Sequence, residues 1–376
     1  MVDILLLALL TVSLIALIWP FFLYPMFLSL LPRRACSKDK AHRPSVSLLF
    51  CAYNEGAAMP AKIANLAMLK RRHPDLEILA FDDRSSDDTA DQLSARPDLV
   101  TLVRGAGRSG KAHGMKQLAA QARGEILVFT DANVMLAPDA IENLLSYYAD
   151  PKVGGVLGSL HYVKGEGESA TAAVGSLYWR IEEQLKDMES RTGNVMGADG
   201  SIFSTRRALY PDFPDTVLDD LTVSMAVVFA GQRLIKAKDV VATENLVSAR
   251  SDEYRRKVRI AARSWHTHLH LRPQLRAMRR LDRFKYTSRK IVRWFGALFL
   301  LTGALSAAIL LWRLNIYAFA AVMGLAVLGL LAGTMMRSGP VAAVMDILIA
   351  YAATLQGVVR AMKGGVMATW APAKSR

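Results

Sequence analysis

The chain has 376 residues, enough for one large or two modest domains; 52% are hydrophobic, and the formal net charge is +14 at pH 7. Its two cysteines are too few for a disulfide framework or a cysteine-based metal site. Residues 250–293 hold fifteen Lys/Arg against three Asp/Glu. This basic region lies directly before an apolar segment, so it fits a belt at a membrane surface and argues against nucleic-acid binding.

The N-terminal segment is an expected transmembrane helix. Residues 1–32 carry one charged side chain, Asp3, and are long enough to span a hydrocarbon core of about 30 Å. A cleaved signal peptide would need a basic start and a shorter apolar core, so we expect an uncleaved helix, kinked at Pro20 and Pro25. Basic residues follow it at once, which predicts that residues 33–271 form a domain on the cytoplasmic side.

From residue 44 to about residue 161, short β-like runs alternate with helix-like runs. This alternation predicts an α/β fold with a mostly parallel, twisted sheet. The expected strands are 46–52, 76–81, 99–103, 126–129 and 153–160. The expected helices between them are 60–71, 87–94, 111–123 and 138–148. The elements expected after them are helices over 169–190, 220–230 and 252–270 and short strands over 233–236 and 240–243.

Polar side chains follow the first two strands of this sheet. Tyr53 and Glu55 come after the first strand, and Asp82 and Asp83 end the second. Open α/β sheets bind ligands at the carboxyl ends of their strands, so we expect these side chains to contact a nucleoside. Capping of the next helix is the alternative, but it does not account for the two aspartates before the turn.

Lys111 follows a glycine-rich run, residues 105–110, at the start of an expected helix. The run lacks the spacing of a P-loop, because Ala112 follows the lysine. The start of a helix still favours anions, and a lysine there adds to this preference. We therefore expect Lys111 beside a diphosphate, with a plain surface lysine as the alternative.

Asp131 and Asn133 lie at the end of the fourth expected strand and form the candidate metal site. Mg2+ and Mn2+ take hard oxygen ligands and complete their shells with water and substrate phosphates. One carboxylate and one amide oxygen can therefore suffice, and we expect Asp131 to face the sugar phosphate as well. A turn-forming Asp/Asn pair is the alternative.

Asp219 and Asp220 open the helix expected over 220–230, where carboxylates also favour the helix dipole. A catalytic base must lie within hydrogen-bond reach of an acceptor hydroxyl, and this acidic pair is the next one at an element boundary. Arg259, in the basic helix, can pair with phosphate and compensate the charge of a leaving diphosphate. A solvated basic face is the alternative for Arg259.

In this order and spacing, these segments resemble the inverting family 2 glycosyltransferases, in particular membrane-anchored members similar to cellulose, hyaluronan and poly-N-acetylglucosamine synthases. The resemblance runs from about residue 44 to residue 265. It implies a single nucleotide-binding domain of the GT-A type, flanked by membrane helices. It also implies that Asp220, at the last position of the family's Thr-Glu-Asp motif, is the catalytic base, and that residues 52–55, 82–89 and 110–112 meet the donor.

The resemblance also implies residues of the acceptor site, and the sequence departs from the family's motifs in two places. Asp199 and Gly200 lie in the glycine-rich acceptor segment, Asp219 precedes the base, and Trp179 is a weaker acceptor-side candidate. Arg259 matches the Arg of the Gln-x-x-Arg-Trp motif of processive members. Arg256 and Ile260 replace its Gln and its Trp, which usually stacks on the acceptor sugar, so processive synthesis is in doubt. Asn133 replaces the second aspartate of the metal motif, which makes dependence on Mg2+ or Mn2+ less secure.

Three apolar segments near the C-terminus, 295–312, 316–336 and 341–359, are each long enough to span a membrane. The last contains Asp346 and Gln356, which are costly in lipid. We expect two to three transmembrane helices over 294–360, a basic amphipathic segment over 272–293 and a basic tail over 361–376. Three spans would place this tail outside, against the charge bias, unless one of the last two segments is re-entrant or interfacial.

Together these features predict an integral protein of the bacterial inner membrane with a cytoplasmic catalytic domain. It would transfer a sugar from a uridine-type nucleotide donor to a lipid-linked or polysaccharide acceptor, in cell-surface or extracellular polysaccharide synthesis. Transfer to a polyprenyl phosphate and a non-catalytic nucleotide-binding regulator are the alternatives. Four spans are few for a polymer-conducting pore, so self-association or a synthase partner stays open, and no nucleic acid is expected.

Overall fold

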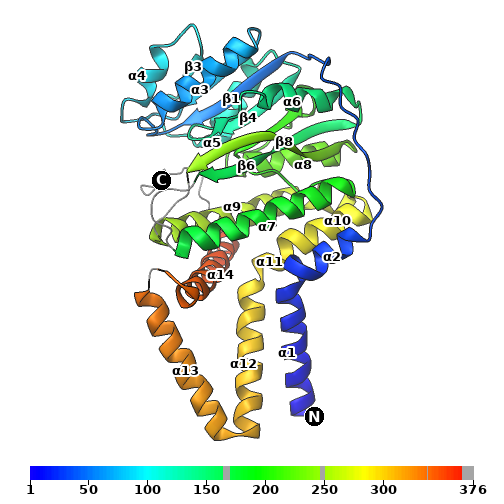
Figure 1. Ribbon diagram of the computed structural model, residues 1–376, viewed down its shortest axis with the longest axis vertical. Helices are drawn as coiled ribbons and strands as arrows, with labels where there is room; N and C mark the ends of the chain where they lie inside the picture. Colours follow the sequence, from blue (N-terminus) through cyan, green and yellow to red (C-terminus); the bar gives the residue numbers. More distant parts are fainter. Residues whose placement is uncertain (164–169, 246–249, 337, 366–376) are drawn as a thin grey trace.

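A computed structural model describes residues 1–163, 170–245, 250–336 and 338–365. An α/β domain stands on a stem of apolar helices, with the N-terminus at the far end of the stem (Figure 1). The predicted helix start at residue 169 and the tail from residue 366 on lie outside the described residues.

The sheet has eight strands in the order β3-β2-β1-β4-β7-β6-β8-β5. β1 to β4 are parallel to one another, whereas β7 runs antiparallel to both β4 and β6, so the sheet is mixed. The strand bounds are β1 Val46–Ala52, β2 Glu77–Asp82, β3 Thr101–Arg104, β4 Ile126–Asp131, β5 Met135–Leu136, β6 Val153–Val163, β7 Ile202–Arg206 and β8 Arg233–Asn245.

The predicted α/β class and its five early strands are confirmed, but three details are wrong. The sequence pattern missed β5 and β7. The two short strands expected over 233–236 and 240–243 are one strand, β8, whose pairing with β6 shifts register between Leu157 and Ser159. The shift interrupts the alternation of side chains that sequence patterns rely on.

Helices cover both faces of the sheet because successive strand residues point to opposite sides. In β1, Leu48 belongs to the core that includes α3 and α6, and Leu49 belongs to the core that includes α5 and α8. Every residue of β1 is buried, as expected for a central parallel strand. The helix bounds are α3 Met59–Arg72, α4 Thr89–Ser94, α5 Lys111–Gln121, α6 Ala140–Ser146, α7 Ala170–Arg191 and α8 Asp219–Phe229.

The chain ends form the stem and the layer between stem and domain. The N-terminal helix bends through a π-helical turn that contains Pro20, which confirms a kink at that proline. α1 and α12 lie side by side, and a Cβ on Gly303 would be 3.1 Å from the Cβ of Ser13. The bounds are α1 Val2–Ile18, α2 Tyr24–Ser29, α9 Arg250–Ala277, α10 Arg280–Tyr286, α11 Val292–Trp294, α12 Gly296–Leu314, α13 Ile316–Met335 and α14 Pro340–Met362.

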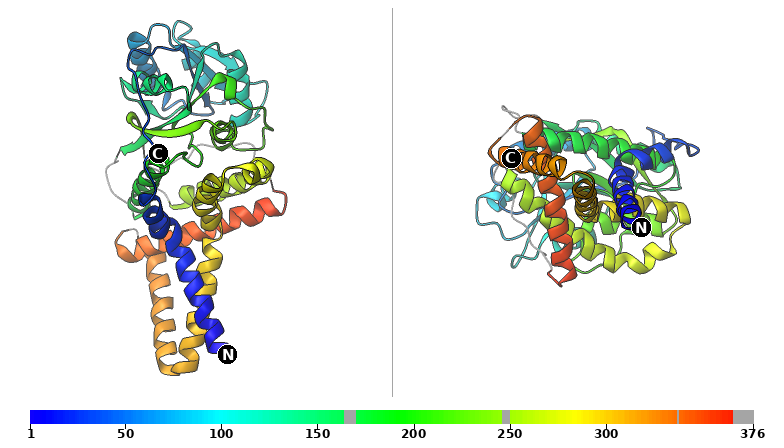
Figure 2. Two further views of the ribbon diagram at one scale, coloured as in Figure 1. Left: turned by 90° about the vertical axis from the view of Figure 1, so that its right-hand side faces the viewer. Right: turned by 90° about the horizontal axis from the view of Figure 1, so that it is seen from below.

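α14 runs crosswise beneath the domain, whereas α1, α12 and α13 run along the stem (Figure 2). By length and composition α14 could cross a membrane, but two of its polar residues are hydrogen-bonded to the domain. The carboxylate of Asp346 pairs with Arg250 at 2.5 Å, and Gln356 accepts a 2.7 Å hydrogen bond from Tyr254. Both partners lie on α9, so the two side chains that would be costly in lipid are satisfied by protein.

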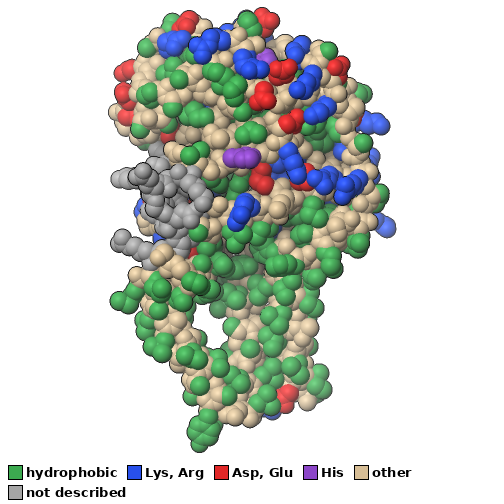
Figure 3. All heavy atoms as spheres, in the orientation of Figure 1, with side chains coloured by type: hydrophobic (Ala, Val, Ile, Leu, Met, Phe, Trp, Pro, Cys, Tyr) green, Lys and Arg blue, Asp and Glu red, His purple; other side chains and the backbone are tan. Residues whose placement is uncertain are grey.

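The basic segment expected over 272–293 is not uniformly an exposed belt. Arg289 is buried and pairs with Glu182 and Glu189 of α7, and Lys285 is buried and donates to the backbone of Glu189. These contacts join the interfacial layer to the domain. The exposed apolar side chains lie mainly on the stem, and most of the charged ones lie on the domain (Figure 3).

Candidate active site

The loops after β1 and β2 are bound to each other at the carboxyl edge of the sheet. The backbone N–H of Asn54 donates to the Ser85 hydroxyl at 3.0 Å, and the side-chain Oδ1 of Asn54 accepts from the Ser86 N–H at 2.8 Å. Asn54 and Arg84 have φ of +51° and +63°, a region that few residues other than glycine adopt. Such backbone conformations concentrate at ligand sites, where surrounding contacts hold them in place.

Tyr53, the first residue after β1, stacks with an arginine. The guanidinium of Arg108 lies 3.2 Å from the centre of the Tyr53 ring, and its Nε lies 3.3 Å from Asp83. The fully buried Asp83 also accepts from the backbone N–H groups of Ser109 and Gly110. Asp83 therefore holds the loop before α5 in place. Its contact with a nucleoside stays a prediction.

Lys111, the first residue of α5, connects the predicted donor and catalytic carboxylates. Its Nζ lies 2.6 Å from Oδ1 of Asp131, the last residue of β4, and 3.9 Å from Oδ2 of Asp219. These two carboxylates and Asp220 raise the pKa of Lys111 although its burial opposes this, so it stays protonated. A Cβ on Gly200 would lie 2.7 Å from this Nζ, so the absence of a side chain leaves the cluster its space.

The acidic pair at the start of α8 has the electrostatics of a base. Burial and the adjacent Asp219 raise the pKa of Asp220 to about 6, while Lys111 opposes the rise. Oδ2 of Asp219 is buried and has no hydrogen-bond partner among the described residues. A carboxylate whose pKa is close to neutral both ionises at physiological pH and accepts a proton readily.

The buried thiol of Cys51, near the end of β1, also lies within the field of this cluster. Burial raises its pKa, Lys111 opposes the rise, and Asp219, Asp83 and Asp131 add to it. Asp131 and Asp219 both lie beside Lys111, and Asp83 accepts from the N–H of the preceding residue, Gly110, so carboxylates from three separate segments lie close together. This is the convergence that the strand-end positions predicted.

The turn that carries Asp131 and Asn133 is held from beneath by α3. The fully buried Lys62 donates to the carbonyl groups of Asp131 at 2.9 Å and Val134 at 2.7 Å. Burial lowers the pKa of Lys62 to about 7, and the nearby Asp131 opposes this shift. Beyond the turn, the Nδ2 of Asn133 donates to Glu244 of β8 at 2.8 Å.

The donor set of this turn fits a divalent cation that also binds substrate phosphates. No group of three or more His, Cys, Asp or Glu side chains that could hold a metal occurs among the described residues, so the protein would supply few ligands. Asp131 offers a partly exposed carboxylate, and Asn133 offers its amide oxygen because its NH2 group is engaged by Glu244. Mg2+ and Mn2+ commonly bind to one or two carboxylates plus substrate phosphates.

Several other predicted residues serve structural contacts. Asp199 pairs with Lys186 of α7 and accepts a hydrogen bond from Ser201. Burial would raise the pKa of Asp199, but the positive charge of Lys186 outweighs this effect and lowers that pKa to about 2. Trp179 donates to the carbonyl group of Leu160 at 3.0 Å. Their roles at an acceptor site stay predictions.

Asp82 and Glu55 bind the neighbouring loop. Both carboxylate oxygens of the buried Asp82 lie 3.3 Å from the backbone nitrogen of Ser85, and the N–H of Glu55 donates to the Thr89 hydroxyl at 2.9 Å. These contacts keep the β1 and β2 loops together. Contact of either side chain with a nucleoside stays a prediction.

The two arginines of the basic helix lie on α9. Burial opposes ionisation of Arg256, but Glu253, Tyr162 and Glu244 outweigh it and raise its pKa. Tyr162 and Glu244 lie near the ends of β6 and β8, so Arg256 lies beside these strand ends. Arg259 is half-buried one turn further along the same helix. Its contact with a diphosphate stays a prediction.

Sequence analysis missed Lys62, Arg108 and Glu244. Lys62 lies on α3, and its contacts are made across 69 and 72 residues of sequence. Glu244 contacts Asn133 across 111 residues. β8 carries four other charged residues, so the charge of Glu244 gave no distinct signal in the sequence.

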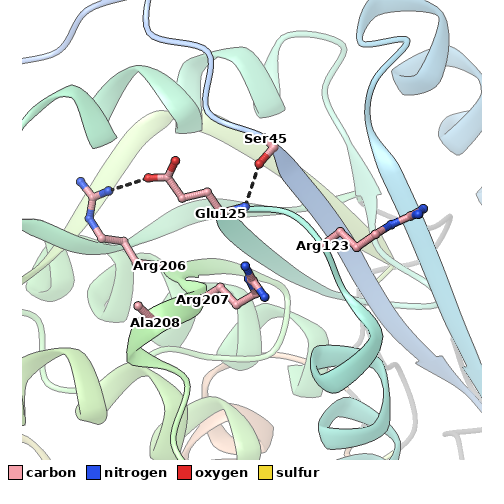
Figure 4. A pocket seen from close by; sticks show the side chains of 6 residues that line it. All are labelled: Ser45, Arg123, Glu125, Arg206, Arg207 and Ala208. Atoms are coloured by element: carbon pink, nitrogen blue, oxygen red, sulfur yellow. Dashed lines mark hydrogen bonds and ion pairs between the residues drawn. The ribbon is translucent and has the colours of Figure 1, made fainter.

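A surface hollow of about 490 Å³ lies at the opposite edge of the sheet, where β1 and β4 begin (Figure 4). Arg206 points toward Glu125 and pairs with it at 3.2 Å. None of the predicted site residues lines this hollow. Its lining residues are Ser45, Arg123, Glu125, Arg206, Arg207 and Ala208.

Comparison with known proteins adds sequence relatives to this geometry. A family profile described as "Glycosyl transferase family 2" matches residues 47–213. An N-acetylglucosaminyltransferase of Rhizobium leguminosarum bv. trifolii is 30% identical over 132 residues, which are 32% of this chain and 70% of that protein. A beta-monoglucosyldiacylglycerol synthase of Synechocystis sp. is 33% identical over 116 residues, which are 30% of this chain and only 24% of that protein's length.

A solved structure shares the fold over nearly the whole chain. The mannosyltransferase PcManGT from Pyrobaculum calidifontis, solved in complex with GDP-Man and Mn2+, superposes with a TM-score of 0.72 and 22% sequence identity. The superposition covers 96% of this chain and 99% of that one. The shared architecture therefore includes the apolar helices as well as the α/β domain.

Proposed function

The chain belongs to glycosyltransferase family 2, and on that premise we propose that it transfers a sugar from a nucleoside-diphosphate donor to an acceptor held at a membrane surface. The observation that carries this proposal is the cluster in which Lys111 bridges Asp131 and Asp219 beside Asp220. A family-wide fold alone would not argue for activity, because function depends on the site.

In the proposed reaction Asp220 accepts the proton of an acceptor hydroxyl as its oxygen attacks the anomeric carbon. The bond from that carbon to the diphosphate breaks on the opposite side, so the sugar is transferred with inversion. Lys111 and Arg259 compensate the charge of the departing diphosphate. A divalent cation held by Asp131 and Asn133 would supply further charge compensation there.

Tyr53 and Asp83 are the proposed contacts of the nucleoside, at the ends of β1 and β2. Arg108 stacks on the same ring and reaches the same carboxylate, so it belongs to this proposed subsite. Glu55 and Asp82 support the subsite through the loop contacts described above. A uridine-type base is the proposed donor nucleotide.

The proposed membrane arrangement follows from α14. If α1, α12 and α13 cross the bilayer and α14 lies along its surface, the basic residues after α1 and those after α14 are on one side, as charge bias favours. That side would be the cytoplasm, where the domain would meet its donor. The proposed location is the bacterial inner membrane.

Three acceptor classes are consistent with this arrangement. One is a growing surface or extracellular polysaccharide, assembled with a further copy or a partner synthase. The other is a lipid, which is favoured by a relative that is named for a glucosylated diacylglycerol and by the position of α14 directly beneath the domain. A polyprenyl phosphate is a third acceptor that needs little help from a base.

The test uses detergent-purified full chain with a membrane lipid extract and a panel of radiolabelled nucleotide sugars. We expect label from one donor to enter lipid or polymer, and Asp220→Asn to reduce transfer by at least about 100-fold while donor binding persists. Retained transfer by Asp220→Asn would favour a phosphate acceptor. Nucleotide binding without consumption of any donor would instead support a non-catalytic regulator.

A further inference from the structure

We propose that Glu244 is a positioning residue that turns the amide of Asn133 so that its carbonyl oxygen faces the donor's cation. The inference rests on the proposed function, because it concerns the cation that would accompany a nucleoside-diphosphate sugar. It accounts for how this chain works with an asparagine where the resemblance expects a second aspartate.

The approach of Glu244 to Asn133 is fixed by the sheet. The turn that carries Asn133 leads directly into β5, and Met135 of β5 pairs with Thr243 of β8. Glu244 is the next residue on β8, and its Oε1 accepts from the Asn133 Nδ2 at 2.8 Å. Two strands joined by backbone hydrogen bonds therefore hold donor and acceptor together, independently of any bound ligand.

The chemistry of an amide explains why such a partner is needed. A carboxylate presents an oxygen to a cation in either orientation of its terminal torsion, but an asparagine presents an oxygen in one orientation and an NH2 group in the other. A hydrogen-bond acceptor beside the NH2 group selects the first orientation. Glu244 is such an acceptor, and an ionised one forms a stronger bond than a neutral one.

The charge of Glu244 has a counterpart on α9. Glu244 is one of the groups that raise the pKa of Arg256, so this arginine lies within its electrostatic reach. Arg256 also lies close to Tyr162, near the end of β6. Glu244 is therefore held between the turn that carries Asn133 and the helix that carries Arg256 and Arg259.

The experiment measures Mn2+ affinity, without turnover, on the detergent-purified full chain in the presence of UDP or GDP. Free Mn2+ is counted by electron paramagnetic resonance. We expect Glu244→Ala to weaken Mn2+ binding by about 10- to 100-fold, as is common for residues that orient metal ligands. Glu244→Gln keeps an acceptor oxygen and should remain close to the wild-type affinity.

Two further variants separate positioning from structural damage. Asn133→Asp in the Glu244→Ala background should restore Mn2+ affinity, because a carboxylate needs no orienting partner. Glu125→Ala, at the opposite edge of the sheet, is the matched control and should bind Mn2+ as the wild type does. Circular dichroism of each variant checks that the fold is retained.

Three results would overturn the inference: unchanged affinity in Glu244→Ala, an equal loss in Glu244→Gln and Glu244→Ala, or no recovery in the double variant. An equal loss would mean that the charge of Glu244, and not its position as an acceptor, is what matters. A wild-type chain that binds neither nucleotide nor Mn2+ would contradict the proposed function as well. A wild type that binds both, with an unaffected Glu244→Ala variant, contradicts this inference alone.

Discussion

The pH dependence of transfer tests the assignment of Asp220 most sharply. With a pKa of about 6, Asp220 is ionised in about nine tenths of the molecules at pH 7 and about one tenth at pH 5. A carboxylate with the ordinary value of 3.8 would still be about nine tenths ionised at pH 5. Because only the ionised base accepts a proton, kcat/KM should fall about tenfold from pH 7 to pH 5.

This fall forms the acidic limb of the plot of kcat/KM against pH. The two charges beside Asp220 should shift the midpoint of that limb in opposite directions. Asp219 raises the pKa of Asp220, so Asp219→Asn should shift the limb to lower pH. Lys111 lowers that pKa, so Lys111→Met should shift the limb to higher pH. Asp215 pairs with Lys116 at 2.6 Å and is not among the groups that shift Asp220, so Asp215→Asn is the control.

The assay follows initial rates of transfer from the labelled donor between pH 4.5 and 8, at low acceptor concentration, so that the slope reports kcat/KM. The limb's midpoint is the measured quantity, because Asp219→Asn and Lys111→Met are also expected to lower the maximum rate. A profile that is flat between pH 5 and pH 7, or midpoints that stay together in all variants, would refute the assignment of Asp220 as the base.

Three substitutions test the structure around the site. Gly200→Ala would bring a Cβ to 2.7 Å from the Lys111 ammonium, so kcat/KM should fall on the order of 100-fold with little change in the thermal unfolding midpoint. Lys62→Met removes the donor to two buried carbonyl groups and should lower the unfolding free energy, measured by chemical denaturation, by about 1–3 kcal/mol for each group. Asp346→Ala removes the partner of Arg250 and should lower it by about 2 kcal/mol in the same measurement, whereas unchanged stability would argue against α14 being held by α9.

Much of the domain was predictable because its first half is regular. The strand Ile126–Asp131 is apolar in its first four residues and ends in a carboxylate. Pro60 lies in the first turn of α3, and Asp88 and Asp139 directly precede α4 and α6. β7 follows a glycine-rich loop and has five residues, and β5 has two, so neither leaves a clear pattern. Their place in the sheet depends on pairing with distant strands, which a local pattern does not contain.

The cluster around Lys111 was predictable in part for the same reason. The ends of parallel strands meet at one edge, so Asp131 was expected near the residues after β1 and β2. Lys62 and Glu244 were not, because their roles arise from contacts across many residues of sequence. The sequence left open whether α14 spans the membrane, because its composition suits a span but Asp346 and Gln356 are costly in lipid. The contacts of these two side chains with α9 show which side of α14 faces protein.

A structure of the full chain with a bound nucleoside diphosphate and Mn2+ tests the central claim most directly. The account predicts that Mn2+ would be held by Asp131 and the diphosphate would lie beside Lys111, with the base of the nucleotide against Tyr53. A nucleotide bound elsewhere, for example in the arginine-lined hollow at the opposite edge of the sheet, would contradict it.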